Sequence, residues 1–151
     1  MILADEAATA RLGVAISRAL HAGEAVCLSG PLGAGKSTLA RALVRALTKP
    51  DEDVPSPTFT LVQFYEGAGL KVAHFDLYRL ISPDEAYEIG LDEALDDGAA
   101  VIEWPERLAG QLPADRLDVE IAIDGAGRRA RLTPHGSWVG RVESLARGMA
   151  D

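Results

Sequence analysis

Apolar residues recur at helical spacing in two segments of the chain. The first segment covers residues 5–21 and ends before Gly23, and the second follows a glycine-rich stretch and ends before Pro50. The apolar positions are Leu12, Ile16, Ala19 and Leu20 in the first segment, and Leu39, Leu43, Ala46 and Leu47 in the second. Repeats of three and four residues place side chains on one face of a helix, and a glycine or proline after the last repeat marks its end. The pattern therefore predicts two amphipathic helices.

Short apolar runs and alternating apolar and polar residues predict the strands. These strands cover residues 24–29, 59–66, 70–77, 99–103, 116–124 and 128–133. The runs at 24–29 and 99–103 are mainly apolar, as buried strands are. Glycine-containing turns at residues 67–69 and 125–127 each separate two of the strands, and this arrangement predicts antiparallel partners.

A short helix and a closing helix complete the pattern. Ser82 is followed by Glu85, which forms a capping box and predicts a short helix that ends at Gly90. Residues 137–148 predict the last helix. Helices and strands are mixed along the chain, and a length of 151 residues fits a single core, so residues 1–151 are expected to form one α/β domain.

Composition and charge narrow the expected cellular location and the expected binding partners. The chain is 48% hydrophobic with a net charge of −8, and this acidity disfavours direct binding of RNA, which needs Lys and Arg to neutralise phosphates. A basic patch is the alternative to a solvated C-terminal face for Arg128, Arg129, Arg131, Arg141 and Arg147. Cys27 lies alone in a predicted buried strand, and the chain shows no signal peptide and no apolar run of ~20 residues. A cytoplasmic protein without membrane contact is expected.

The glycine-rich stretch carries the pattern G-x-x-x-x-G-K-[ST], matched by Gly30, Gly35, Lys36 and Ser37. Glycines let backbone N–H groups turn inward on a phosphate, and the helix that begins there adds its positive end. Lys36 would reach the β- and γ-phosphates, and the Ser37 hydroxyl would ligate Mg²⁺. No guanine-reading stretch follows, which favours ATP over GTP. The expected nucleotide-binding residues are Gly30, Pro31, Leu32, Gly33, Ala34, Gly35, Lys36, Ser37 and Thr38.

Two carboxylates are candidates for holding the metal and for orienting the attacking water. Glu103 ends the predicted strand 99–103, and a carboxylate at the C-terminal end of a parallel strand points into the ligand crevice. A surface glutamate at a strand end is the alternative. Asp76 shares one face of its strand with His74, so it could contact Mg²⁺ or the water. A structural His74–Asp76 pair and an Asp76–Arg79 pair remain open for it.

A proline-stiffened loop adds a candidate switch. Pro55 and Pro57 fix φ and display Ser56 and Thr58 about twenty residues after Lys36. Switch loops of nucleotide hydrolases place a threonine that senses the γ-phosphate at such a position. Thr58 is therefore a candidate sensor, and a plain structured turn is the alternative.

Five motifs together resemble the TsaE (YjeE) family. They are GPLGAGKST, SPTFTLVQFY, HFDLYRL, IGLDE and IEWPER, in the order and spacing of that family. The likeness runs from about residue 5 to residue 133. HFDLYRL and IEWPE are specific to the family, whereas the phosphate loop alone is not.

The resemblance implies a P-loop NTPase fold of three layers, with a mostly parallel central sheet plus antiparallel strands. It implies a Mg²⁺-dependent ATPase required to form the threonylcarbamoyl group on adenosine 37 of tRNAs that read codons beginning with adenine. The protein would act by binding the TsaD–TsaB complex and resetting it through ATP hydrolysis, and it would meet tRNA only indirectly.

The resemblance also implies roles for single residues. These are Lys36, Thr58, Asp76 and Glu103 for catalysis, Ser37, Asp76 and Glu103 for the metal, and Thr58 and Trp104 for the switch and partner contact. Thr9 and Arg128 would line the nucleotide pocket. The family often has Asp where this chain has Pro31, and the missing N–H could alter nucleotide affinity.

Two rival functions would use the same loop. A small-molecule kinase should carry an arginine-bearing lid, and residues 82–98 contain no arginine-rich segment. A non-hydrolytic assembly module would bind ATP to organise its partners without turnover.

Overall fold

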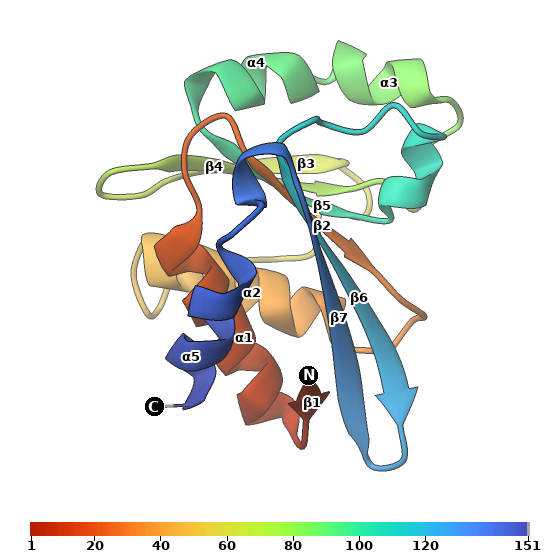
Figure 1. Cartoon of the computed structure of the whole chain (residues 1–151). Helices are drawn as coiled ribbons and strands as arrows, with labels where there is room; N and C mark the ends of the chain where they lie inside the picture. The colour runs from red at the N-terminus through yellow and green to blue at the C-terminus, as the bar shows by residue number, and fades with distance from the viewer. Residues whose placement is uncertain (151) are drawn as a thin grey trace.

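A mixed sheet runs through the fold in the order β1-β7-β6-β2-β5-β4-β3 (Figure 1). The computed structural model describes residues 1–150, and its strands are β1 Ile2–Leu3, β2 Ala25–Ser29, β3 Val62–Glu66, β4 Lys71–Asp76, β5 Ala99–Glu103, β6 Arg116–Asp124 and β7 Gly127–His135. The central strands β6, β2, β5 and β4 are parallel neighbours. Strands β1, β7 and β3 add antiparallel pairings at the edges. Three parallel pairings therefore form the centre of the sheet, and three antiparallel pairings lie toward its edges, so the sheet as a whole is less parallel than the resemblance implies.

Helices cover both faces of this sheet (Figure 1). They are α1 Glu6–Ala19, α2 Lys36–Leu47, α3 Pro83–Glu88, α4 Leu91–Asp97 and α5 Val142–Ala150, with the 3-10 turns η1 Pro105–Leu108 and η2 Gly136–Trp138. Successive strand residues point to opposite faces, so Val101 packs in the cluster under α1 and α2, whereas Ile102 packs in the cluster under α3, α4 and η1. The result is a helix–sheet–helix sandwich with an apolar core on each side of the sheet.

Most predicted elements are confirmed, and the differences have local causes. The strand predicted from residue 59 begins only at Val62, because Leu61 adopts a left-handed backbone with φ 67°. The last helix begins at Val142, because η2 and a turn at Gly140 (φ 93°) precede it. Strand β1 and helix α4 were not predicted. No helix within residues 1–150 combines the length and apolar character that a membrane crossing requires.

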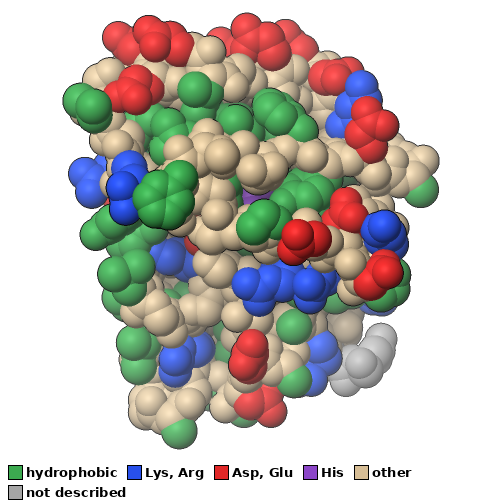
Figure 2. Space-filling model, turned by 180° about the vertical axis from the view of Figure 1, so that it is seen from behind, with side chains coloured by type: hydrophobic (Ala, Val, Ile, Leu, Met, Phe, Trp, Pro, Cys, Tyr) green, Lys and Arg blue, Asp and Glu red, His purple; other side chains and the backbone are tan. Residues whose placement is uncertain are grey.

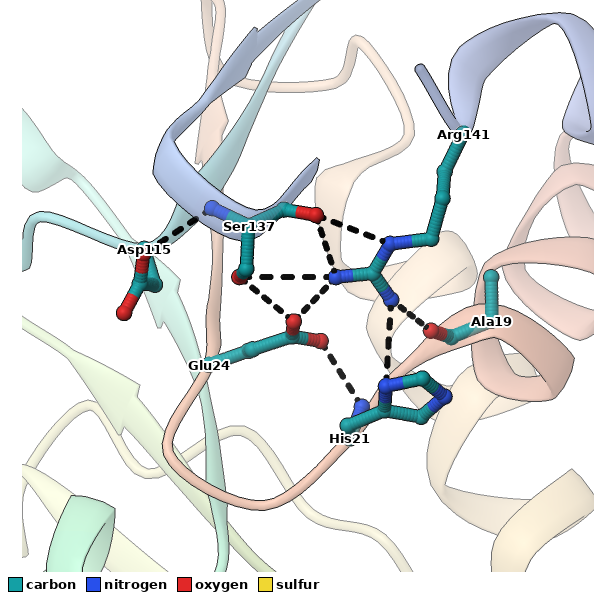
Figure 3. Close-up of polar contacts among 6 residues, drawn as sticks. All are labelled: Ala19, His21, Glu24, Asp115, Ser137 and Arg141. Atoms are coloured by element: carbon teal, nitrogen blue, oxygen red, sulfur yellow. Dashed lines mark hydrogen bonds and ion pairs between the residues drawn. The ribbon is translucent and has the colours of Figure 1, made fainter. Parts of the chain in front are cut away.

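Glu24 and Arg141 tie the C-terminal segment to the start of β2 (Figure 3). Arg141 donates to the Glu24 carboxylate and to the carbonyls of Ala19 and Ser137, and its guanidinium lies 4.3 Å from the centre of the Trp138 ring. The Ser137 hydroxyl donates to the same carboxylate at 2.6 Å. Burial raises the pKa of Glu24, but the hydrogen bonds from Arg141 and Ser137 outweigh it and leave the pKa below its ordinary value.

Candidate nucleotide-binding site

The phosphate loop lies between the end of β2 and the start of α2, and two of its glycines are required by geometry. Gly30 has φ 139°, and a Cβ there would meet the carbonyl oxygen of Ile121 at 2.3 Å. Gly35 caps α2 with φ 110°, and a Cβ would lie 3.3 Å from the methyl group of Thr9. No side chain caps α2, and its first turn carries no acidic residue. The first N–H groups of α2 and its positive end can therefore bind an anion.

Lys36 lies under this loop and is 5% exposed. Its ammonium donates to the carbonyl of Gly30 at 2.5 Å and lies 3.4 Å from the centre of the Trp104 ring. Burial lowers the pKa of Lys36, and this effect outweighs the nearby carboxylates, chiefly Glu103, which raise the pKa. Trp104 reaches this position with a left-handed backbone (φ 60°), an unusual conformation for a large side chain.

Glu103 ends β5 beside Ser37 and is 2% exposed, which rules out the surface-glutamate alternative. The Ser37 hydroxyl donates to Glu103 Oε1 at 3.3 Å. Glu103 Oε2 lies 2.7 Å from Nε2 of His74, which projects from the neighbouring strand β4. Glu103 therefore faces Ser37 with one oxygen and His74 with the other.

Asp76 is the contact point of the proline-stiffened loop. Its Oδ2 accepts hydrogen bonds from the hydroxyls of Thr58 at 3.1 Å and Ser56 at 3.3 Å, and its Oδ1 accepts the backbone N–H of Tyr78 at 3.1 Å. Neither structural alternative for Asp76 is found among residues 1–150, because His74 pairs with Glu103, whereas Arg79 lies over the ring of Phe59. The carboxylate is thus linked to the candidate switch.

Two cavities border the loop. One has a volume of about 390 Å³, and its lining includes Leu32, Lys36, Ser37, Thr58, Asp76, Glu103 and Trp104. The other, about 330 Å³, is lined by Asp5, Glu6, Thr9, Ala34, Arg128 and neighbouring loop residues. They share Gly33, Gly35 and Thr38. The Arg128 guanidinium donates to the carbonyl of Gly33 at 3.0 Å, which joins the tip of the β6–β7 hairpin to the loop.

The structure brings the candidate residues of the sequence together, and it adds others. Pro31 remains at the exposed tip of the loop, where its carbonyl accepts the N–H of Ala34. The sequence did not single out Ser56 as a partner of Asp76, nor His74 as a partner of Glu103. His74 and Glu103 meet because β4 pairs with β5, and neither strand's own sequence shows which strand it pairs with.

The donor set suits Mg²⁺ held together with phosphate. Ser37 and Glu103 offer neighbouring oxygens, and Asp76 lies directly opposite Glu103 in the pairing of β4 with β5. Within residues 1–150, no three His, Cys, Asp or Glu side chains gather closely enough to hold a metal ion by themselves. Mg²⁺ usually takes one or two protein carboxylates and completes its shell with phosphate oxygens and water.

Known proteins share both the sequence and the fold. The family model described as "Threonylcarbamoyl adenosine biosynthesis protein TsaE" matches residues 3–131. The tRNA threonylcarbamoyladenosine biosynthesis protein TsaE of Aquifex aeolicus is 41% identical over 134 residues, which cover 87% of this chain and 93% of that protein. The protein of the same name from Treponema pallidum is 38% identical over 122 residues, covering 80% of this chain and 89% of that protein.

A solved structure extends the likeness to three dimensions. The crystal structure of YdiB from Bacillus subtilis matches this fold with a TM-score of 0.73 at 26% identity, covering 97% of this chain and 89% of that chain. The residues around the phosphate loop all fall within the span of the family model. The chain therefore belongs to the TsaE family.

Proposed function

We propose that this protein is a Mg²⁺-dependent ATPase of the P-loop NTPase fold that serves the formation of threonylcarbamoyladenosine in tRNA. One observation carries the proposal: Lys36 and Ser37, at the start of α2, share a cavity with Asp76 and Glu103, at the ends of parallel strands. This is the arrangement of a phosphate loop facing acidic groups from the sheet.

The loop would bind the phosphates of ATP. The backbone N–H groups at the start of α2 would donate to phosphate oxygens, and the Lys36 ammonium would exchange its hydrogen bond to the Gly30 carbonyl for one to phosphate. The second cavity, with Thr9 and Arg128, would receive the remainder of the nucleotide. The absence of a guanine-reading motif from the sequence supports adenine as the base.

The two carboxylates would have different roles, one in binding the metal and one in orienting the attacking water. Ser37 and Glu103 would hold Mg²⁺, which neutralises charge on the phosphates. Asp76 would orient the attacking water and, through its hydrogen bond with Thr58, pass the state of the phosphates to the switch loop. Trp104 contacts Lys36, so it would respond to the same change.

The names of the relatives support the biological setting. The curated TsaE proteins are described as tRNA threonylcarbamoyladenosine biosynthesis proteins, and we infer the same role for this chain in the cytoplasm. ATP hydrolysis would reset a TsaD–TsaB complex that performs the modification. The net charge of −8 supports contact through proteins and only indirect contact with tRNA.

ATP hydrolysis by the purified chain, alone and with TsaD and TsaB, tests the proposal. We expect weak hydrolysis alone, a higher rate with the partners, and loss of both in Asp76→Ala and Glu103→Ala. Tight ATP binding without hydrolysis in either setting would show an assembly module instead. Transfer of the phosphoryl group to a metabolite would show a kinase.

A further inference from the structure

A buried histidine stands behind the candidate metal site, where the proposed mechanism does not use it. His74 and Glu103 are each 2% exposed, and their Nε2 and Oε2 atoms lie 2.7 Å apart. Burying a polar group costs free energy unless it forms a hydrogen bond, and the cost is largest for a charged group such as a carboxylate. His74 supplies such a donor to Glu103.

The position of the ring proton follows from the other nitrogen. Nδ1 of His74 is buried and has no hydrogen-bond partner among the described residues. A proton on Nδ1 alone would bury an unsatisfied N–H and would set the Nε2 lone pair against a carboxylate oxygen 2.7 Å away. A proton on Nε2 alone satisfies Glu103 and leaves at Nδ1 only an acceptor. His74 is therefore the donor of this hydrogen bond.

This hydrogen bond limits what Glu103 can do. With Oε2 held by His74, Oε1 is the oxygen turned toward the Ser37 hydroxyl, 3.3 Å away. Without such a partner, the Glu103 side chain would populate several rotamers, and Oε1 would not stay turned toward Ser37. Asp76 does not substitute for His74, because its oxygens are engaged with Thr58, Ser56 and the N–H of Tyr78.

We propose that His74 is a positioning residue that fixes the Glu103 carboxylate so that Oε1 and the Ser37 hydroxyl together receive Mg²⁺. The inference rests on the proposed function, since it assigns Mg²⁺ to this pair of oxygens. Hydrogen bonds that orient a metal-binding side chain are commonly worth 10- to 100-fold in metal affinity. His74 would contribute through Glu103 and would touch neither nucleotide nor metal.

Binding of a non-hydrolysable ATP analogue with a fluorescent ribose label, measured with Mg²⁺ and with a chelator, tests this role. We expect His74→Leu to reduce the Mg²⁺-dependent gain in affinity about 10- to 100-fold and to leave binding in chelator unchanged. His74→Gln, whose amide can donate to Glu103, should restore most of the gain. His135→Leu breaks another histidine–carboxylate hydrogen bond, to Asp118 (2.9 Å), away from the two cavities that border the phosphate loop, and should behave as the unaltered chain.

The outcomes separate this inference from the proposed function. If the unaltered chain gains affinity from Mg²⁺ and His74→Leu keeps the full gain, the positioning role is wrong and the proposed function stands. If the unaltered chain does not bind the analogue, both are wrong. Nitrogen NMR of the unaltered chain provides a second check that needs no variant: a proton on Nε2 supports the donor role, and a proton on Nδ1 alone overturns it.

Discussion

Lys36 shows how one residue of the site depends on several neighbours. Its ammonium touches the Gly30 carbonyl and the face of Trp104, while burial lowers its pKa and the surrounding carboxylates act against that effect. An opposite charge nearby favours the charged form of a buried lysine, which burial disfavours. The contacts of Lys36 thus place its amino group at the point where phosphate is expected.

Replacing this lysine should weaken phosphate binding selectively. Each charge-assisted hydrogen bond is worth ~1.5–3 kcal/mol, so we expect Lys36→Ala to weaken ATP binding about 10- to 150-fold in calorimetric titration. Lys49→Ala is the matched control, because the exposed Lys49 ammonium lies in a long pair with Glu52 (3.9 Å). This variant should bind ATP as the unaltered chain does. Equal affinity in the two variants would contradict the assigned role.

A methyl group at Gly30 should damage the loop and the fold together. The added carbon would lie 2.3 Å from the Ile121 carbonyl oxygen, at a φ that favours glycine. Overpacking of this kind costs ~1–3 kcal/mol, so Gly30→Ala should lower the thermal midpoint and weaken nucleotide binding. Gly69→Ala has no atom within 4 Å of the new carbon and no strained φ, and it should change neither. An unchanged midpoint in Gly30→Ala would show that the loop has room to shift.

At the scale of elements, the anchor between Glu24 and Arg141 holds α5 against the rest of the fold (Figure 3). The pKa of Glu24 is lower in the folded protein than its ordinary value of 4.5, because hydrogen bonds to the ionised form outweigh burial. Ionised Glu24 therefore stabilises the fold above that pH, and the contribution is lost as the pH falls through the folded-state pKa.

Removing this charge should change how stability depends on acidity. We expect Glu24→Gln to lower the free energy of unfolding at neutral pH by ~1.5–3 kcal/mol. In this variant the free energy of unfolding should also fall less steeply as the pH drops below the ordinary pKa of a carboxyl group. Asp124→Asn breaks the exposed pair with Arg129 (3.1 Å) and should cost at most ~1 kcal/mol. Denaturant unfolding across acidic and neutral pH measures both, and an equally steep decline in Glu24→Gln would refute the assignment.

The elements that the sequence predicted are those whose signal is local. The β3–β4 hairpin and the helix after the phosphate loop follow from periodicity and turn residues within a few positions. Strand β1 was missed because its two residues carry no periodicity, and its pairing with β7 joins distant parts of the chain. The chemistry of the site followed the same rule: the phosphate loop was predicted from one motif, whereas the contact of His74 with Glu103 depends on strand pairing.

Across the whole molecule, charge is unevenly distributed. Figure 2 shows acidic side chains gathered along the top, over the layer of α3 and α4. The exposed acidic residues of these helices are Asp84, Glu88, Asp92, Glu93, Asp96 and Asp97. Several arginines of the C-terminal part have internal partners: Arg128 binds the phosphate loop, Arg129 pairs with Asp124, and Arg141 pairs with Glu24. Arg128 and Arg141 are therefore held by internal contacts, and the charge of Arg129 is partly offset by Asp124 at the surface, which weakens the basic-patch alternative.

The isolated chain should consequently bind tRNA poorly. We expect fluorescence anisotropy with labelled tRNA to show no saturable binding at physiological salt, because phosphate contacts need free cations. Addition of TsaD and TsaB should bring the chain and tRNA into one assembly if contact is indirect. Tight binding by the chain alone that weakens steeply with salt would contradict this distribution of charge.

The two tryptophans occupy very different positions, and this gives the protein a pair of intrinsic optical probes. Trp104 lies over the Lys36 ammonium at the phosphate loop, whereas Trp138 is fully buried beneath Arg141 at the C-terminal anchor. Indole emission responds to a nearby charge and to exposure to water. The emission of a Trp138→Phe variant would therefore follow events at the phosphate loop, and that of Trp104→Phe would follow release of the last helix.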